Sequence, residues 1–576
     1  MVCNTVTIQI IADAAHPNVI LIMTDDQGYG DVACHGNPVI KTPCIDQLHA
    51  ESLRLTNFHV SPYCTPTRAA LMTGRYPART GAYRTSSGRT MLHRDEQTIA
   101  NIFSDAGYVT GMIGKWHLGD NAPHRPQDRG FQEVLWHRCG GVGQASDYYG
   151  NDYFDDTYER NGVFENFTGY CTDIWFNEAK SFVERHQKEP FFLYLATNAP
   201  HGPYRVDPEW SEPYRDSVLW GHGANFYGMI ANIDHNVGLL REHLEELKLA
   251  ENTILVFMTD NGTSNGIPKG ELPAGSYRGF NAHMRGKKST VYEGGHRVPC
   301  FLHWPGGGLK EGKDFHGLTA HLDLLPTLLD LCEIQLPQDH CPDGFSFAEN
   351  IHDEKVTAHR DHYIAQLHGG AGFHHPEEPW DTSCVCRGPW RLINGTELYD
   401  LRTDRSQQKN IAEDHPDVIA ELRNLYETFW QSVSPRMEPI AIDVGNPLEN
   451  PTTLCSQDWY LPFGNPPWNF NSINRRVPIT GPWHVMVQQK GKYRITLRQL
   501  PKEADEPVIA EQASLTLAGI THEADVPTGA SHIDFFVDLP TGKTKIETKL
   551  WSGTSPAGGA YFTEVEFLHP SNKNQE

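Results

Sequence analysis

The sequence lacks the features of several common protein classes. Only 12 cysteines occur in 576 residues, and none form a CxxC pair, which argues against a disulfide scaffold or a structural zinc site and leaves the redox compartment open. No apolar run approaches the length of a membrane span, so we expect no integral membrane segment. Lys and Arg total 48 against 72 Asp and Glu, and the net charge of −24 disfavours nucleic acid as a partner.

The chain is longer than one hydrophobic core usually supports, so we expect two or three domains. In the first two thirds, apolar runs alternate with helical patterns, which predicts an α/β fold with a largely parallel sheet. Helices are expected at 95–106, 226–247 and 417–433. From about 445, short alternating segments at 483–487, 493–497, 533–539, 543–550 and 561–568 predict an all-β appendage.

Four apolar runs end in polar side chains. Residues 19–23 lead into Asp25 and Asp26, and 108–114 lead into Lys115 and His117. Residues 191–197 lead towards His201, and 254–258 lead into Asp260 and Asn261. In open α/β sheets, ligands bind beyond the carboxyl ends of the strands. The polar residues that follow these four runs would therefore lie close together if the strands are parallel and adjacent.

The acidic residues that follow two of these strands predict a metal site. Asp25, Asp26, Asp260 and Asn261 offer only hard oxygen ligands, which suit Ca²⁺ or Mg²⁺ better than zinc. The alternative is that each acidic pair caps a loop after its strand.

A short helix is expected after Cys64, with Thr65 as its N-cap, Pro66 at the first helical position and Gly74 as its stop. Cys64 would then lie just outside a helix N-terminus, where the helix dipole favours an anion. The alternative is a small buried cysteine that packs before a helix.

The stretch from Cys64 to Arg75, CTPTRAALMTGR, resembles the signature C-x-P-S-R-x-x-x-L-T-G-R of the type I, formylglycine-dependent sulfatases. It departs from that pattern at Thr67, where Ser is usual, and at Met72, where Leu is usual. The blocks GKWHLG (114–119), APHGP (199–203), DNG (260–262) and Lys288 followed by EGG (293–295) match the family in the same order. The resemblance spans roughly residues 17–430.

This resemblance implies that Cys64 is oxidised by a maturing enzyme to formylglycine, whose hydrate attacks the sulfur of a sulfate ester. One divalent ion, Ca²⁺ or Mg²⁺, would be held by Asp25, Asp26, Asp260, Asn261 and position 64. The implied catalytic residues are Cys64, Arg68, Lys115, His117, His201 and Lys288, with Lys287 as the rival for the last position.

The implied fold resembles alkaline phosphatase: a large mixed sheet flanked by helices over 17–350, a small antiparallel subdomain over 351–440, and an accessory β-rich domain over 441–570. That last domain could cover the mouth of the site, contact a glycan or mediate assembly. Its Trp459, Trp468 and Trp551 could stack on sugars, although core packing is the simpler role.

The substrate is left open by the sequence. Aryl sulfates and sulfated carbohydrates both fit, and residues that contact the alcohol would lie in the loops 83–93, 137–156 and 368–386. A phosphate or phosphonate ester hydrolase and a non-catalytic glycan-binding relative are the alternatives. The resemblance implies a periplasmic or secreted protein, but residues 6–12 are too short and lack the basic flank of a signal peptide, so a cytoplasmic location stays open.

Overall fold

The computed structural model describes residues 16–570 except 310, 353–359, 369–376 and 463. The apolar segment 6–12 lies outside the described residues. Within the described part of the chain, no helix combines the length and apolarity needed to cross a membrane.

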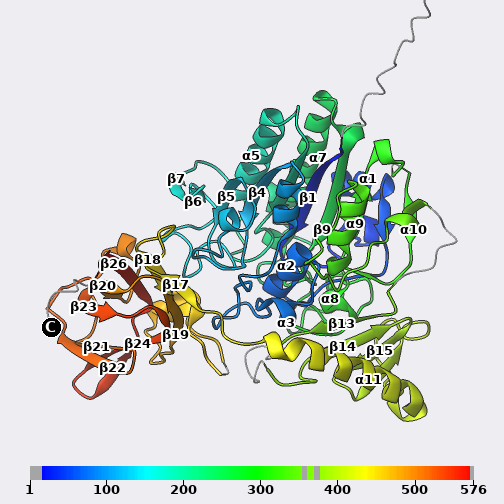
Figure 1. Ribbon diagram of the computed structural model, residues 1–576. Coiled ribbons are helices and arrows are strands. Elements are labelled where there is room, and N and C mark those ends of the chain that lie inside the picture. Colours follow the sequence, from blue (N-terminus) through cyan, green and yellow to red (C-terminus); the bar gives the residue numbers. More distant parts are fainter. Residues whose placement is uncertain (1–15, 310, 353–359, 369–376, 463, 571–576) are drawn as a thin grey trace, which may run out of the picture.

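A ten-stranded mixed sheet forms the centre of the larger lobe, in the order β11-β2-β10-β9-β1-β8-β4-β5-β6-β7 (Figure 1). Its strands are β1 (Asn18–Thr24), β2 (Leu53–Leu55), β4 (Val109–Lys115), β5 (Glu133–His137), β6 (Thr157–Arg160), β7 (Val163–Asn166), β8 (Phe191–Ala196), β9 (Thr253–Thr259), β10 (Cys300–His303) and β11 (Lys313–Phe315). The four predicted strands are β9, β1, β8 and β4, which are adjacent and parallel.

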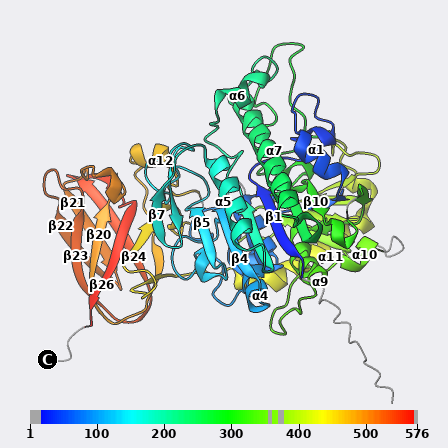
Figure 2. The same cartoon turned by 90° about the horizontal axis from the view of Figure 1, so that it is seen from above.

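Helices cover both faces of this sheet because its central strands are apolar on both sides. Val19, Leu21 and Met23 of β1 point to one face, where they share a core with α2 (Cys64–Thr73), α4 (Ile99–Asp105) and α9 (Leu324–Leu331). Ile20 and Ile22 point to the other, towards α1 (Pro43–Ala50), α5 (Cys171–Arg185) and α7 (Gly223–Glu246). Figure 2 shows α5 and α7 lying along the sheet.

The shorter elements connect these layers or lie beside them. They are β3 (Phe58–His59), β12 (Thr319–Ala320), α3 (Pro77–Thr80), α6 (Pro208–Ser211), α8 (Glu293–His296), α10 (Ala348–His352) and α12 (Phe470–Asn474).

A small antiparallel sheet follows, as predicted. It contains β13 (His362–Gln366), β14 (Ser383–Arg387), β15 (Trp390–Ile393) and β16 (Glu397–Asp400). The long helix α11 (Pro416–Val433) packs on it through Leu422 and Tyr426 (Figure 1). The helix predicted at 417–433 therefore exists with nearly the predicted bounds.

The C-terminal region is all-β and has a core of its own. One sheet contains β17 (Ile442–Val444), β19 (Trp483–Val487), β21 (Gln512–Leu517), β22 (Ile520–Asp525), β24 (Gly542–Ser552) and β25 (Ser555–Gly558). The other contains β18 (Thr452–Cys455), β20 (Gly491–Arg498), β23 (Ile533–Leu539) and β26 (Phe562–His569). The predicted fold class is confirmed, whereas the boundaries at 350 and 440 stay predictions.

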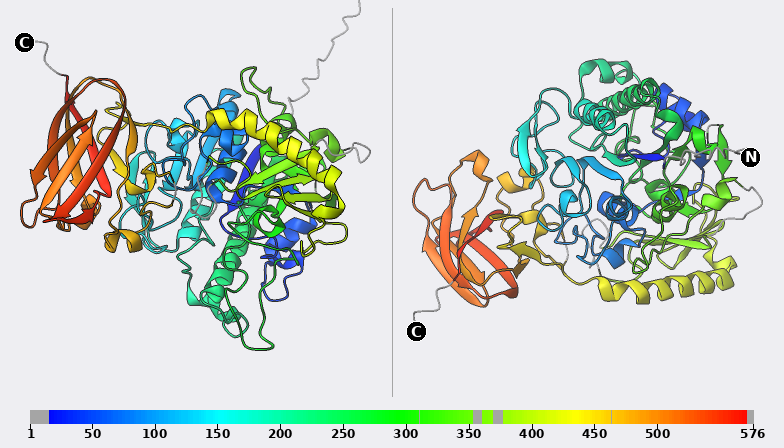
Figure 3. Two further views of the ribbon diagram at one scale, coloured as in Figure 1. Left: turned by 90° about the horizontal axis from the view of Figure 1, so that it is seen from below. Right: turned by 45° about the horizontal axis from the view of Figure 1, so that its top comes forward.

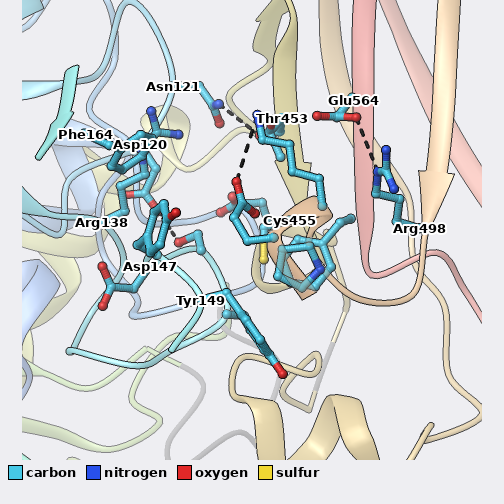
Figure 4. Close-up of a pocket in the computed structure, with 18 residues that line it drawn as sticks. Asp120, Asn121, Arg138, Asp147, Tyr149, Phe164, Thr453, Cys455, Arg498 and Glu564 are labelled. Carbon is cyan, nitrogen blue, oxygen red and sulfur yellow. Dashed lines mark hydrogen bonds and ion pairs between the residues drawn. The ribbon is translucent and has the colours of Figure 1, made fainter. Parts of the chain in front are cut away.

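The C-terminal β region packs against one side of the α/β region (Figure 3). Asn121 of the α/β region donates a hydrogen bond to the carbonyl of Thr453 at 3.0 Å, beside a small cavity at the junction (Figure 4). On the far side of that cavity Arg498 pairs with Glu564 within the β region. The two regions therefore meet through specific polar contacts.

Candidate active site

The ends of three parallel strands bring acidic and basic side chains together. Asp25 follows β1, Lys115 ends β4 and Asp260 follows β9. All three side chains are fully buried, and Lys115 Nζ lies 2.5 Å from Asp25 Oδ2. The convergence expected from the apolar runs is therefore present at the carboxyl edge of the sheet.

Cys64 is the first residue of α2 and reaches the same place. One ligand atom each from Asp25, Cys64 and Asp260 lies within 4.8 Å of the others. The predicted N-cap at Thr65 is wrong. Tyr63 is the extended N-cap, and its carbonyl accepts the Thr67 N–H at 3.2 Å, so the helix begins two residues before the predicted start. The predicted stop at Gly74 is present, with φ of 66°.

The donor atoms of this cluster suit a hard divalent ion. Asp25 Oδ1 and Asn261 Oδ1 are buried, and the described residues offer neither of them a hydrogen-bond donor. Asn261 Nδ2 instead donates to Asp26 Oδ1 at 2.9 Å, which fixes the amide beside the acids. Buried oxygen atoms without donors are costly unless a cation satisfies them, so the set Asp25, Asp26, Asp260 and Asn261 fits Ca²⁺ or Mg²⁺.

Two acids of the cluster differ in their electrostatic surroundings. Burial raises the pKa of Asp260 to about 7, and the neighbouring Asp25 adds to this shift. Burial acts in the same direction on Asp26, but Lys288 and His201 outweigh it and hold its pKa below the ordinary value. Lys288 Nζ lies 2.5 Å from Asp26 Oδ1. Its own pKa, which burial alone would lower, is held well above the ordinary value by Asp26.

Arg68 is fully buried and does not line the pocket that opens onto Cys64. Its guanidinium is fully buried and donates to Asp260 Oδ2 at 2.9 Å and to the Lys115 carbonyl at 2.9 Å. It also donates to the Tyr194 hydroxyl at 3.3 Å. These bonds tie α2 to the ends of β4, β8 and β9, so Arg68 orients Asp260 and Lys115.

The two histidines face the pocket in fixed orientations. His201 Nδ1 lies 2.7 Å from the Gly202 carbonyl, which makes Nδ1 the protonated nitrogen and turns Nε2 towards Asp26 Oδ2 at 3.8 Å. Burial lowers the pKa of His201 to about 4 and that of His117 well below its ordinary value. Both are therefore neutral imidazoles near pH 7 in this state.

Two consecutive glycines that the sequence reasoning missed make room for these rings. A Cβ on Gly140 would lie 2.5 Å from His117 Cε1, and one on Gly141 would lie 3.1 Å from His201 Nδ1. The first distance is shorter than a tolerable carbon–carbon contact, so a side chain at position 140 would displace the His117 ring.

A pocket of about 230 Å³ opens onto Cys64. Of the predicted catalytic residues, Cys64, His117, His201 and Lys288 line it, whereas Lys115 and Arg68 lie beneath it. Lys287 is not part of the lining, which favours Lys288 between the two candidates. Besides the predicted catalytic residues and Trp468, which the sequence suggested could stack on a sugar, the wall contains Tyr63, Thr85, Ser86, Gly140, Gln144, Ser289, Gln457 and Asn465. Four of these lie in two of the predicted loops, 83–93 and 137–156.

Two family profiles match the chain. The sulfatase profile covers residues 17–334, and the profile of the N-sulphoglucosamine sulphohydrolase C-terminal region covers 283–431. The chain belongs to the sulfatase family. The resemblance carried by the motif from Cys64 to Arg75 is thereby confirmed, and the fold expected from it is shared with solved sulfatases.

This member of the sulfatase family is 32% identical to human N-acetylgalactosamine-6-sulfatase over 366 residues, which are 58% of this chain and just under two thirds (66%) of that protein. It is 31% identical to human arylsulfatase A over 472 residues, 72% of this chain and 88% of the relative. The solved structure of Ps i-CgsB in complex with k-i-k-neocarrahexaose is 28% identical, with a TM-score of 0.63, and the match covers 73% of this chain and 94% of that one.

Proposed function

We propose that this protein hydrolyses sulfate monoesters with a hydrated formylglycine, derived from Cys64, as the nucleophile. The observation that carries the proposal is the position of Cys64 at the floor of a pocket, within 4.8 Å of Asp25 and Asp260 and beside Lys288, His117 and His201. A sulfate ester is an anion, and a protein of net charge −24 needs a local group of cations to bind it. Lys288 and Lys115 supply that charge.

The reaction has two steps. One hydroxyl of the hydrated aldehyde attacks sulfur, the S–O bond to the alcohol breaks, and the alcohol leaves after taking up a proton. The second hydroxyl of the same carbon then loses its proton, the C–O bond to sulfate breaks, and the aldehyde re-forms with release of sulfate. Water restores the hydrate. A plain cysteine or serine ester lacks the second hydroxyl and would have to wait for attack by water.

The side chains around position 64 divide this work. Lys288 and His201 both line the pocket beside Cys64. The Lys288 ammonium would stabilise the charge on the ester oxygen or protonate it as the alcohol leaves. His201 would do the same only in its protonated form, because its neutral ring carries its single proton on Nδ1, which donates to the Gly202 carbonyl. His117 lines the same pocket and would take the proton of the remaining hydroxyl, because burial keeps its ring neutral. Asp260 would accept the first hydroxyl proton: like Asp25, it has a ligand atom within 4.8 Å of that of Cys64, and burial raises its pKa to about 7.

A divalent ion held by Asp25, Asp26, Asp260 and Asn261 would supply Lewis-acid stabilisation of negative charge near position 64. Lys115 and Lys288, which pair with Asp25 and Asp26 here, would then be available to bind the oxygens of the sulfate group. Arg68 keeps Asp260 oriented throughout.

The test is a mass measurement on the peptide that contains Cys64, combined with a substrate comparison. Conversion of the thiol to formylglycine lowers the peptide mass by about 18 Da. In a host that supplies the maturing enzyme, we expect this shift together with release of sulfate from 4-nitrophenyl sulfate at a higher rate than phosphate from 4-nitrophenyl phosphate. An unshifted peptide from that host, or faster phosphate release, would contradict the proposal.

A further inference from the structure

The C-terminal β region supplies part of the wall of the catalytic pocket. Gln457, Asn465 and Trp468, called the wall residues below, line the same pocket as Cys64 and Lys288. The matched family profiles end at residues 334 and 431, so the wall residues lie beyond both. This part of the pocket therefore belongs to this chain's own C-terminal region.

Gln457 anchors the wall to the α/β region. Its side chain is buried, donates to Asp120 Oδ2 and Ser146 Oγ at 3.0 Å each, and accepts from the Cys139 thiol. Its carbonyl accepts the Ser87 N–H at 2.7 Å. Because both ends of the amide are engaged, Gln457 fixes the position of the wall rather than offering bonds to a ligand.

Asn465 and Trp468 are held by their neighbours but present side chains to the pocket. The Trp468 carbonyl accepts the Ala145 N–H at 3.0 Å, next to a β-bridge between Gln144 and Asn469. Asn465 Oδ1 accepts from Arg84 at 3.0 Å, and the described residues offer no acceptor to its Nδ2. Both main-chain and side-chain bonds thus orient these two residues without using their ligand-facing groups.

The exposure of Trp468 separates it from Trp459 and Trp483 of the C-terminal region, which are fully buried. Trp459 is fully buried in the core of that region, whereas 37% of Trp468 is exposed. An exposed indole costs the protein hydrophobic stabilisation, and its flat face suits the apolar face of a sugar ring or an aromatic ring. Packing into the core accounts for Trp459, but it leaves the exposed surface of Trp468 without a role.

The polar residues of the pocket favour a sugar ring over a simple aryl ring as the bound group. Neutral amide and hydroxyl side chains surround the approach to Cys64: Thr85, Ser86, Gln144 and Asn465. Such groups donate to and accept from hydroxyl groups, which a sugar carries and a simple aryl ring lacks. Together with one exposed indole, they form a site for a hydroxylated ring.

We propose that Asn465 and Trp468 bind the sugar ring of a sulfated carbohydrate, so that the C-terminal β region is a substrate-specificity element of the active site. The inference rests on the proposed sulfatase function, because the pocket is assigned to the substrate only if position 64 is the nucleophile. Trp468 stacks on the ring and Asn465 Nδ2 donates to a ring hydroxyl. Gln457 is a positioning residue.

The experiment has two parts. Ligand binding is measured in an inactive variant, and turnover is measured in the formylglycine-bearing enzyme. In the full chain carrying Cys64→Ala, calorimetry gives Kd for a panel of hexose and hexosamine monosulfates and for 4-nitrophenyl sulfate. For the monosulfates that bind, we expect Trp468→Ala to weaken Kd about fivefold to tenfold and Trp468→Phe to retain most of the affinity. Asn465→Ala should weaken sugar binding about fivefold and leave 4-nitrophenyl sulfate unchanged.

The matched control is Phe536→Ala, which removes a 57% exposed aromatic side chain from β23, outside the pocket. It should leave every Kd unchanged, and the thermal midpoints of all variants should agree. In the formylglycine-bearing enzyme, Trp468→Ala and Asn465→Ala should raise KM for the sugar sulfates with kcat changed less than about twofold.

The outcomes separate the two proposals. Absence of sulfate release from every ester, with the affinity changes as expected, would contradict the proposed function and leave the wall residues as a sugar-binding site. Turnover of sugar sulfates with unchanged Kd and KM in Trp468→Ala and Asn465→Ala would overturn this inference alone. Binding of 4-nitrophenyl sulfate more tightly than any sugar sulfate would also overturn it.

Discussion

Arg68 and Asp260 form an ion pair at 2.9 Å in which neither side chain is exposed to solvent. The pair joins the second turn of α2 to the end of β9, and Asp260 also accepts the Asp26 N–H at 3.0 Å. The Arg68 guanidinium therefore fixes the position of the helix that carries Cys64 relative to Asp260 and Asp26. A buried pair of this kind is costly to break, since the remaining partner stays charged and out of water.

Replacing Arg68 with Lys tests how much this ion pair contributes to stability and activity. A lysine keeps the charge but lacks the several donors that reach Asp260, the Lys115 carbonyl and Tyr194 together. We expect a loss of about 3 kcal/mol in the free energy of unfolding and at least about a hundredfold in kcat. Urea denaturation and steady-state kinetics give the two values. Arg54→Lys is the control, because its pair with Asp314 is partly exposed and should contribute less than about 1 kcal/mol. Equal effects in the two variants would rule out a special role for the buried pair.

Adjacent lysines provide a matched comparison for the group that faces the ester oxygen. Lys288 lines the pocket and pairs with Asp26, whereas Lys287 does not line it. Lys288→Ala should lower kcat for sulfate esters by about a hundredfold or more, because a preorganised cation is lost where charge develops. Lys287→Ala should stay within about twofold of the wild type. A larger loss in Lys287→Ala than in Lys288→Ala would reverse the assignment.

Removal of divalent ions tests the oxygen cluster. Treatment with EDTA should abolish sulfate release and lower the thermal midpoint, and added Ca²⁺ or Mg²⁺ should restore both. An ion that binds only the folded state stabilises it by about 3 kcal/mol when its concentration is a hundred times its Kd. Asp25→Asn should lower the metal content measured by plasma mass spectrometry. Asp234→Asn changes a buried acid that caps α1 by accepting the Ile45 N–H at 2.7 Å, and it should keep the metal. Full activity in EDTA would contradict an ion at this site.

The parts of the site that could be predicted from the sequence are those carried by single strands and by the motif. β1 and β9 are apolar on both faces, so their bounds and the acids that follow them are visible in the chain. Helix starts were less accurate, because they depend on capping. In α4, Thr98 caps the helix by accepting the Asn101 N–H, so the helix begins at Ile99 rather than at Asp95 as predicted.

The loops 83–93 and 137–156 do contribute to the pocket wall as expected, but the part of the wall from the C-terminal β region could not be predicted, because it reaches the site only through tertiary contacts. Trp468 follows Cys64 by about 400 residues and lies in a Pro- and Asn-rich loop without periodicity. Its place is set by the Ala145 N–H and by the anchoring of Gln457 on Asp120. The paired glycines at 140 and 141 have no pattern of their own either; the rings of His117 and His201 and the side chain of Gln144, which lie close to them, explain them.

The junction between the two regions predicts a pH dependence of stability. Burial raises the pKa of Asp458 to about 8, and the neighbouring Asp120 adds to the shift. Between about pH 4 and pH 8 the unfolded chain has released this proton while the folded protein keeps it, so the free energy of unfolding falls as the pH rises. The contribution of this one group is about 1 kcal/mol per pH unit.

Asp458→Asn should remove this contribution. Relative to the wild type, the variant should gain thermal stability at pH 8 and gain little at pH 4, because an amide has no proton to release. Asp525→Asn changes an exposed acid on β22 and should leave the pH profile as it is in the wild type. Thermal midpoints measured at half-unit steps from pH 4 to pH 8.5 give the profiles. Parallel profiles for Asp458→Asn and the wild type would show that Asp458 is already ionised in the folded protein near neutral pH, contrary to the shift expected from its burial beside Asp120.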